Sequence, residues 1–370
     1  MFLKSIELNN FRNYKKLKID FNKTTNLILG NNAQGKTNLL ESIYYTSMGR
    51  SFKPVKDRDV INFDEEASII KASAHKYDDN LDISIVLRKN GDKEIKKDGV
   101  KLKKISELCD NMLVVMFSPE DLKIVKEEPE KRRRFIDREL SLISPMYLDN
   151  LNNYKKTLFQ RNNYLKEENI DDILIDVLDK QLANYGYEII KYRDEFIKNL
   201  QDYVEKIHSG ITSGKEKIKL AYKPNLKPKS KEEFEKILKE DFYKDRKNAV
   251  TSRGPHRDDI EFLINKIDVR RYGSQGQQRT CALSVRLAEL SLIEEETGES
   301  AILLLDDVMS ELDLNRQEYL IKTFEHNQIF ITATELSNDI IAKLNSVNKI
   351  FIKNGKVIEG ESNDRTESYK

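Results

Sequence analysis

The sequence has almost no net charge, little cysteine and no long hydrophobic segment. Its 370 residues include 64 Lys and Arg against 63 Asp and Glu, which gives a formal net charge of +1. Any attraction to nucleic acid must therefore come from local basic clusters, because the chain as a whole has almost no charge with which to attract a polyanion. The two cysteines, Cys109 and Cys281, match no metal-binding or redox spacing, which favours a reducing compartment.

Membrane and secretory signals are also missing. The longest apolar runs, such as residues 112–117 and 302–305, have four to six residues, whereas a membrane-spanning helix needs about 20. The N-terminal residues lack the basic and apolar segments of a signal peptide. We therefore expect a soluble, cytoplasmic protein without a membrane partner.

Residues 1–110 are predicted to form mainly strands. Apolar and polar residues alternate in several segments, for example at residues 81–87, as in strands with one buried face. The Asn-Gly pair at 90–91 and the Asp-Gly pair at 98–99 predict hairpin turns, because both central positions of the favoured turn need positive φ. We expect an antiparallel sheet here, interrupted by at least one helix.

The remainder of the chain has two other patterns. Residues 111–254 carry long, charged segments with the period of a helix, which predict a mainly helical part. In residues 255–370, short apolar runs such as 302–305 and 328–332 alternate with helical segments, as in an α/β layer. The predicted fold class is α/β. A mixed sheet and an antiparallel sheet come from the two ends of the chain, and a mainly helical lobe is inserted between them.

A phosphate-binding loop is predicted near the N-terminus. Gly30, Gly35, Lys36 and Thr37 match G-x-x-x-x-G-K-T, with the strand-like residues 27–29 before the motif and a helical pattern after it. In such loops, backbone N–H groups surround phosphate oxygens, the lysine reaches the terminal phosphates and the threonine binds Mg²⁺. The residues expected to bind the phosphates are Gly30, Asn31, Asn32, Ala33, Gln34, Gly35, Lys36 and Thr37.

Two acidic residues end an apolar run much later in the chain. Asp306 and Asp307 follow residues 301–305, and an acid at a strand end beside a phosphate loop is the usual second support for Mg²⁺. We expect Asp306 to coordinate Mg²⁺ through water, and Asp307 to orient or deprotonate the attacking water. The 265 positions from Thr37 to Ile302 are too many for a small P-loop kinase or GTPase. The predicted catalytic residues are Lys36, Asp306 and Asp307.

Residues 265–268 (Asn-Lys-Ile-Asp) fit the N-K-x-D motif with which GTPases recognise guanine. In GTPases the Mg²⁺-side aspartate precedes this motif, whereas Asp306 follows it here. A turn between two strands explains the same residues through ordinary Asn and Asp turn chemistry. We favour the turn, with guanine specificity as the alternative.

Residues 270–283 begin with polar residues and two glycines and lead into a predicted helix. Ser274 and Gly276 stand at the start of this helix, where free N–H groups, a hydroxyl and the helix dipole together can bind an anion. An ordinary helix N-cap would explain Ser274 by itself. Because the chain also carries the phosphate loop, Asp306 and the S-E-L-D sequence at residues 310–313, we interpret the segment as a second anion-binding element.

These elements, in this order, resemble the ABC-type ATPase heads of the SMC and Rad50 class. The resemblance implies that the nucleotide is ATP. It also implies that the S-x-G-Q-like signature of one subunit contacts the γ-phosphate held by the loop of another, so that ATP joins two copies of the chain as a homodimer. The signature residues implied to bind ATP are Ser274, Gly276 and Gln277, with Ser274 sensing the γ-phosphate.

The sequence is more closely similar to the RecF family of recombination-repair proteins. Segments that look like RecF signatures, in RecF order, are NFRNY (10–14), GRSFK (49–53), FSPEDLKIVKEEPEKRRRFID (117–137), SRGPHRDD (252–259), YGSQGQQRT (272–280) and LLLDDVMSELD (303–313). One departure is Glu127-Glu128 before Pro129, where the family usually has small residues. The resemblance implies a weak, DNA-stimulated ATPase of recombinational repair and replication-fork maintenance. Such a protein binds double-stranded DNA near single-strand gaps and helps to load RecA with RecO and RecR.

Other functions agree less well with the sequence. An SMC or Rad50 protein needs a long coiled coil, but the 134 positions from Pro119 to Arg253 contain prolines and no sustained heptads. The alternative function, an ABC-headed nuclease of the overcoming-lysogenisation-defect type, needs an acidic Toprim site after the ATPase, and only residues 308–370 follow Asp307. A transporter ATPase is disfavoured because ITATE at 331–335 lacks the switch histidine.

Basic residues that could contact DNA lie in three places. Arg132 and Arg133 belong to a dense cluster, but the flanking acids suggest that they could equally form structural salt bridges. Residues 215–231 carry seven lysines and one glutamate and could follow a phosphate backbone. Arg12 and Arg50 are close to the phosphate loop in sequence and could contact nucleotide or DNA phosphate. The predicted DNA contacts are Arg12, Arg50, Arg132, Arg133, Lys227 and Lys229.

Overall fold

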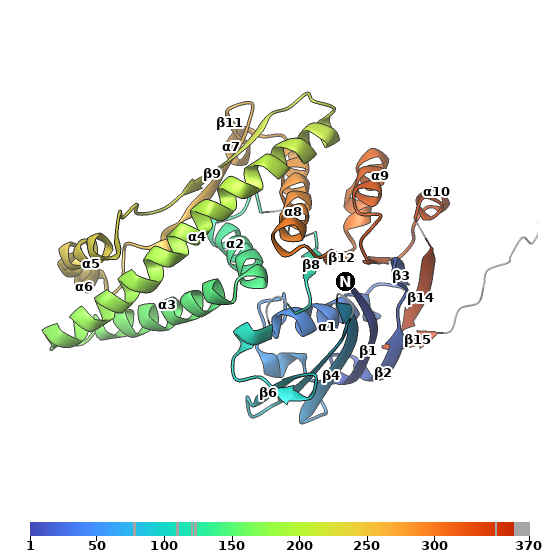
Figure 1. Cartoon of the computed structure of the whole chain (residues 1–370), viewed down its shortest axis with the longest axis horizontal. Coiled ribbons are helices and arrows are strands. Elements are labelled where there is room, and N and C mark those ends of the chain that lie inside the picture. The colour runs from blue at the N-terminus through green and yellow to red at the C-terminus, as the bar shows by residue number, and fades with distance from the viewer. Residues whose placement is uncertain (77–78, 109–110, 120, 122–123, 345, 359–370) are drawn as a thin grey trace, which may run out of the picture. The chain divides into compact units, whose positions relative to one another are not determined.

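The chain folds into two compact units (Figure 1). The computed structural model describes residues 1–76, 79–108, 111–119, 121, 124–344 and 346–358. Unit 1 consists of Met1–Pro119 and Glu299–Lys370, and unit 2 of Glu120–Gly298. Cys281 is buried and forms no disulfide, and Cys109 lies outside the described residues. Among the described residues, no helix combines the length and hydropathy that crossing a membrane requires.

Sheet A of unit 1 is antiparallel, with the strand order β2-β1-β4-β5-β6-β7. Its strands are β1 (Phe2–Phe11), β2 (Tyr14–Asp20), β4 (Ala67–Lys76), β5 (Asp79–Arg88), β6 (Lys93–Lys97) and β7 (Val100–Lys101). Asp98 and Gly99 both have positive φ between β6 and β7, as the predicted two-residue turn requires. At 90–91 only Gly91 has positive φ, within the longer connection 89–92, so the two-residue turn predicted there is wrong. The alternating Leu81, Ile83 and Ile85 of β5 are buried. The predicted antiparallel sheet is therefore confirmed.

Sheet B of unit 1 is mixed, with the order β15-β14-β3-β13-β12-β8. Its strands are β3 (Thr25–Leu29), β8 (Val114–Phe117), β12 (Ile302–Asp306), β13 (Ile329–Ala333), β14 (Val347–Lys353) and β15 (Lys356–Ile358). Neighbouring strands are parallel except β14 and β15. The carboxyl ends of parallel strands meet at one edge of a sheet, where α/β proteins bind ligands. The ends of β3, β12 and β13 therefore come together.

Helix α1 (Lys36–Met48) lies between the two sheets of unit 1. It contacts β4 of sheet A as well as β8 and β12 of sheet B. Almost all of its side chains are consequently buried, including the polar Ser42 and Thr46, whose hydroxyls donate to backbone carbonyls of the helix. The remaining helical segments of unit 1 are η1 (Asp57–Val60), η2 (Ile105–Leu108), η5 (Val308–Glu311), α9 (Leu314–Thr323) and α10 (Asn338–Ile341).

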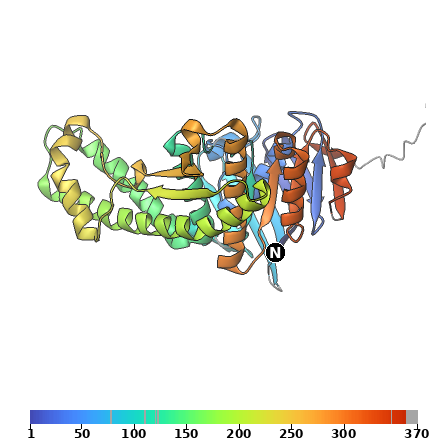
Figure 2. The same ribbon diagram turned by 90° about the horizontal axis from the view of Figure 1, so that it is seen from above.

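Unit 2 is mainly helical. Its helices are α2 (Pro129–Ile143), α3 (Pro145–Tyr164), α4 (Asp172–Thr212), α5 (Lys231–Glu240), α6 (Phe242–Asn248), η4 (Pro255–Arg257), α7 (Val269–Tyr272) and α8 (Gln275–Thr297). The strands β9 (Ile218–Lys223), β10 (Asp259–Ile264) and β11 (Ile267–Asp268) form sheet C in the order β11-β10-β9. Figure 2 shows this sheet alongside the long helix α4, which β9 contacts.

The unit boundaries differ from the divisions at 110/111 and 254/255 that the sequence suggested. Strand β8, within residues 111–119, pairs with β12 and so belongs to unit 1. Residues 255–298 belong to unit 2, because β10 pairs with β9 and α8 packs against α4. Strand pairing and helix packing between distant segments leave no trace in local periodicity. The assignment of the signature segment to the ATPase head stays a prediction that rests on the resemblance.

Buried arginines hold unit 2 together. Arg193 of α4 binds Asp137 (Nη2–Oδ1 2.8 Å) and Asp258 (Nη1–Oδ2 2.9 Å). Arg132 of α2 binds Asp259 (Nε–Oδ1 2.5 Å), and its side chain is only 1% exposed. A guanidinium group this deeply buried must be paired inside the protein and cannot reach DNA. The prediction that Arg132 contacts DNA is therefore wrong, and Arg132 forms a structural salt bridge instead.

Candidate nucleotide-binding site

The predicted phosphate loop joins β3 to α1 at the carboxyl edge of sheet B. Gly30 and Gly35 have φ of 154° and 118°, a conformation that side chains rarely allow. A Cβ atom at Gly30 would lie 2.4 Å from the carbonyl oxygen of Ile352, and one at Gly35 would lie 2.7 Å from Nδ2 of Asn13. Both glycines are thus required by the backbone and by neighbouring segments, even without a ligand.

Two hairpin turns hold the loop in place. Between β1 and β2, the Tyr14 hydroxyl donates to the carbonyl of Gly35 (2.9 Å), and Asn13 Nδ2 donates to the carbonyl of Gln34 (3.0 Å). Between β14 and β15, the backbone N–H of Gly355 donates to the same carbonyl of Gln34 (3.1 Å). Burial raises the pKa of Tyr14, so its phenol stays a neutral donor. Within the NFRNY motif, Asn13 and Tyr14 therefore support the phosphate loop, a structural role in addition to the phosphate contact predicted for Arg12.

The ammonium group of Lys36 lies inside the phosphate loop. Its Nζ donates to the backbone carbonyls of Gly30 (2.6 Å) and Asn31 (3.2 Å), and the residue is 4% exposed. The first turn of α1 adds free N–H groups and the positive end of the helix dipole. The hollow at this end of α1 is lined by Asn32, Ala33, Gly35, Lys36, Thr37, Asn38 and Asp307. The loop and the Asp307 side of β12 therefore meet around a cavity suited to phosphate.

The two residues predicted to support Mg²⁺ are hydrogen-bonded to each other. Thr37 Oγ1 donates to Asp306 Oδ1 (2.9 Å), and Thr332 Oγ1 donates to the same oxygen (2.9 Å). The Thr332 hydroxyl also accepts the N–H of Asp307 (2.9 Å). Mg²⁺ prefers oxygen ligands and usually keeps water and phosphate oxygens around it, so this carboxylate and these hydroxyls fit the ion. The sequence did not predict Thr332 as a site residue, because its contact with Asp306 depends on the pairing of β13 with β12.

The ionisation of Asp306 leads to a stability prediction. Desolvation raises the pKa of Asp306, although hydrogen bonds from Thr332 and Thr37 partly offset it. A raised pKa in the folded state means that the ionised carboxylate costs stability above that pKa. We expect Asp306→Asn to raise the Tm of the nucleotide-free protein at neutral pH by about 2 °C.

This gain should disappear as the pH falls through the pKa of Asp306, because the protonated carboxyl group is neutral like the amide. We expect Mg²⁺ with nucleotide to raise the Tm of the unaltered protein, and we expect the same variant to lose this rise. Scanning calorimetry over a range of pH measures both effects. A Tm below that of the unaltered protein at neutral pH would show that the carboxylate is not a stability cost.

Arg12 is close to the nucleotide site but is held by an acidic residue of α1. Arg12 Nη2 lies 2.6 Å from Glu41 Oε1, and Lys53 Nζ lies 3.2 Å from Glu41 Oε2. Burial by itself would raise the pKa of Glu41, but hydrogen bonds from Arg12 and Ser51 and the charge of Lys53 lower it overall. Glu41 is therefore an ionised anchor for two of the predicted motifs. Arg50 is half-buried, and phosphate contacts by Arg12 and Arg50 stay predictions.

Ser274 caps helix α8, as the sequence suggested. Its Oγ accepts the N–H of Gln277 (3.2 Å), and Gln277 Oε1 accepts the N–H of Ser274 (3.0 Å), which is a reciprocal capping box. Gly276 is exposed, and a Cβ atom there would meet only Ser274 Oγ, at 3.9 Å. No contact among the described residues therefore requires glycine at position 276.

The GTPase-like motif forms a hairpin turn. Asn265 and Lys266 have φ of 50° and 69°, and Ile264 pairs with Ile267 on either side of them. Two residues with positive φ between paired strands are the favoured two-residue hairpin connection. The interpretation as a turn is confirmed, and the motif lends no support to guanine specificity.

The other predicted DNA contacts differ in exposure. Lys227 and Lys229 are exposed between β9 and α5. Arg133 is half-buried and donates to the carbonyl of Asp258 (2.7 Å). The two lysines are therefore free to meet a large ligand, whereas the guanidinium group of Arg133 is partly engaged within unit 2.

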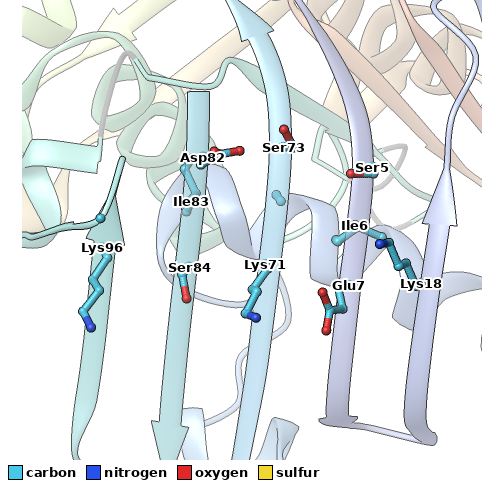
Figure 3. A pocket seen from close by; sticks show the side chains of 12 residues that line it. Ser5, Ile6, Glu7, Lys18, Lys71, Ser73, Asp82, Ile83, Ser84 and Lys96 are labelled. Atoms are coloured by element: carbon cyan, nitrogen blue, oxygen red, sulfur yellow. The ribbon is translucent and has the colours of Figure 1, made fainter. Parts of the chain in front are cut away.

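A shallow trough on sheet A carries further basic side chains (Figure 3). The strand register aligns Lys18, Glu7, Lys71, Ser84 and Lys96 in one row across five neighbouring strands. The three lysines are exposed. The row could not be predicted from the sequence because its members come from five strands, and only the strand register brings them together.

The chain is similar to several proteins of known sequence. Residues 2–359 match the family described as RecF/RecN/SMC N terminal domain. The chain is 44% identical to the DNA replication and repair protein RecF of Clostridium perfringens (strain SM101 / Type A) over 362 residues, which cover 96% of this chain and 99% of the relative. It is 45% identical to that of Agathobacter rectalis, over 95% of this chain and 97% of the relative.

Solved structures are similar to the chain as well. The structure described as the recombination mediator protein RecF-ATPrS in the RecFOR pathway has a TM-score of 0.89 and 41% identity, and the match covers 96% of this chain and 97% of that one. The corresponding RecF-ATP structure has a TM-score of 0.88. An Smc head bound to the C-winged helix domain of ScpA is 16% identical with a TM-score of 0.56, which shows a shared fold alone. The predicted α/β fold of the ATPase-head type is confirmed.

Proposed function

Because this chain belongs to the RecF family of DNA replication and repair proteins, we propose that it is an ATP-controlled clamp on DNA. Two copies join around two ATP molecules and grip double-stranded DNA near single-strand gaps. In the cytoplasm the clamp works with RecO and RecR to help load RecA. The observation that carries the proposal is the cavity in which Lys36, Thr37 and Asp307 surround space for phosphate.

The phosphates of ATP are proposed to bind in the loop from Gly30 to Thr37. Lys36 contacts the terminal phosphates, while Thr37 and Asp306 hold Mg²⁺, which offsets phosphate charge when it is bound. Asp307 has φ of 51°, uncommon for a residue other than glycine and more frequent at functional sites. We assign Asp307 to orient or deprotonate the water that attacks the γ-phosphate. Hydrolysis is proposed to be slow and to serve the release of the clamp.

The signature at the start of α8 is proposed to bind the γ-phosphate held by another copy of the chain. Ser274 and Gly276 are exposed at this helix end, where free N–H groups and the dipole favour an anion. Glycine inside a helix lowers helix stability relative to alanine by about 1 kcal/mol, and among the described residues a Cβ atom at position 276 would meet only Ser274 Oγ. A second subunit that approaches the backbone closely would account for the glycine.

Retention of gapped DNA tests the proposed function. A labelled duplex with a single-strand gap is incubated with the protein in the presence and absence of ATP and Mg²⁺. We expect the DNA to be retained when ATP is present and to be recovered uncut. Cleavage of the DNA would support the nuclease alternative, and retention that does not depend on ATP would contradict the clamp.

DNA affinity is expected to depend on Lys227 and Lys229. Each lysine that neutralises a phosphate releases a counterion, so the variant Lys227→Glu with Lys229→Glu should bind more weakly and reduce the salt dependence of log K by about 2. Fluorescence anisotropy with duplex DNA at several salt concentrations measures both quantities. The matched variant Lys71→Glu with Lys96→Glu changes the trough on sheet A. A loss of affinity in that variant alone would move the DNA contact to sheet A.

A further inference from the structure

Glu216 is the one acidic residue among the lysines of residues 215–231, and it contacts the signature helix. Its Oε1 accepts a hydrogen bond from Gln277 Nε2 (2.9 Å). Its Oε2 lies 3.3 Å from His208 Nε2, and the side chains of Glu216 and His208 are 21% and 0% exposed. Helices α4 and α8, which carry His208 and Gln277, pack against each other. Glu216 therefore contacts α8 directly and is largely buried, unlike a charged side chain that is surrounded by water.

The partner of the second oxygen is a neutral histidine. Burial lowers the pKa of His208, although the Glu216 carboxylate partly opposes this. A neutral imidazole can donate its Nε2–H to Glu216, and its Nδ1 lies 2.9 Å from the Ser284 hydroxyl of α8. Both oxygens of Glu216 are thereby occupied by donors that belong to α4 and α8. The carboxylate has little freedom to rotate.

The backbone at Glu216 is fixed on both sides. At the end of α4, Ser213 and Gly214 have positive φ, and the N–H of Gly214 donates to the carbonyl of Ser209 (2.8 Å). The N–H of Lys217 donates to Asn265 Oδ1 (3.0 Å), and the N–H of Asn265 donates to the carbonyl of Lys217 (2.8 Å). The GTPase-like turn therefore has a structural use, because it anchors the loop that carries Glu216.

Glu216 determines which way the amide of Gln277 faces. Gln277 uses Oε1 to accept the N–H of Ser274, and it uses Nε2 to donate to Glu216. If the amide were reversed, its NH₂ group would face the N–H of Ser274 and its oxygen would face a carboxylate, so both contacts would be repulsive. Only one orientation of Gln277 is compatible with Glu216. That orientation is the one that completes the capping box of Ser274.

We propose that Glu216 is a positioning residue for Ser274, acting through Gln277 to hold the signature backbone ready for the γ-phosphate of a second copy. The proposal rests on the function proposed above, because it concerns the same site between two subunits. Glu216 itself touches no nucleotide in this account. It belongs to unit 2 together with Ser274 and Gln277, so the whole relay moves as part of one compact unit.

A reciprocal exchange tests this relay. Gln277→Glu places two carboxylates against each other and should lower ATP-dependent dimer affinity by about tenfold, the effect of one hydrogen bond to a charged group. Glu216→Gln keeps one acceptor for Gln277 but loses the charge and the second acceptor, so it should lower the affinity by less than Gln277→Glu does. The double variant Glu216→Gln with Gln277→Glu restores a donor opposite a carboxylate and should recover the affinity that Gln277→Glu lost. Sedimentation velocity in the presence of ATP measures the dimer affinity of all three variants.

Two controls keep the outcomes distinct. Glu261→Gln on β10 removes a carboxylate that pairs with Lys223 on the same unit (3.0 Å), and it should leave dimer affinity unchanged. Ser274→Arg should abolish the ATP-dependent dimer. Suppose that Ser274→Arg abolishes the dimer as expected. If the double variant then fails to recover affinity, or if Gln277→Glu dimerises normally, the role of Glu216 is refuted while the proposed function stands. If Ser274→Arg dimerises normally, the proposed function fails.

Discussion

Replacing Lys36 with methionine is expected to lower the affinity for ATP by about 100-fold or more, the effect of losing two hydrogen bonds from a charged group. The Lys36 ammonium is held in the loop by the carbonyls of Gly30 (2.6 Å) and Asn31 (3.2 Å). It is therefore placed for phosphate before ATP arrives, and little conformational freedom is lost on binding. Methionine keeps most of the apolar side chain, so the loss should come from the charge. Titration calorimetry with ATP and Mg²⁺ measures it.

The matched control is Lys322→Met. Lys322 is exposed in α9 of the same unit, so this variant removes one positive charge without touching the loop. ATP affinity should stay within about twofold of the unaltered protein, because exposed charges far from a site are screened. If Lys36→Met binds ATP as well as Lys322→Met does, the phosphate assignment of the loop is wrong.

Replacing Ser274 with arginine is expected to abolish ATP-dependent dimerisation while ATP still binds each subunit. Ser274 is exposed at the N-terminus of α8. Arginine there would remove the hydroxyl and cover the free N–H groups that are proposed to meet the γ-phosphate held by a second subunit. We expect the dimer affinity in the presence of ATP to fall by about 100-fold or more, as for a central interface residue. Light scattering with and without ATP measures dimerisation, and titration calorimetry measures ATP binding to the subunit.

Loss of a helix cap must be separated from loss of the interface. Removal of an N-cap costs about 0.5–2 kcal/mol of stability. Ser230 caps α5 in the same unit, where its Oγ accepts the N–H of Glu233 (3.3 Å). Ser230→Arg should therefore lower the Tm as Ser274→Arg does, yet dimerise normally with ATP. Equal loss of the dimer in both variants would show that Ser274 matters only for the stability of its helix.

The parts of the site that are contiguous in the chain could be predicted from the amino-acid sequence alone. The strand, the loop from Gly30 to Thr37 and the start of α1 are contiguous, and the requirement for glycine is local. The cap of α8 by Ser274 is local in the same sense. The apolar run before Asp306 also predicted a strand end correctly, because a buried parallel strand is apolar on both faces.

What could not be predicted depends on the register between distant strands. Thr332 reaches Asp306 only because β13 pairs with β12, and Tyr14 reaches Gly35 only because sheet A brings the β1–β2 turn to the loop. The partner of Arg132 could not be identified because Asp259 is 127 positions away in sequence. Long-range ion pairs of this kind leave no local signal. For the same reason, the role proposed for Glu216 could not have been read from its lysine-rich segment.

We propose that one complete ATP site consists of the loop of one subunit and the signature of another. The test is to mix Lys36→Met protein with Ser274→Arg protein. In a dimer of either variant alone, both ATP sites would be defective. In the mixed dimer, the intact loop of the Ser274→Arg subunit faces the intact signature of the Lys36→Met subunit. We predict that the mixture recovers ATP-dependent dimers that neither variant forms alone. A mixture that stays monomeric with ATP would contradict the account.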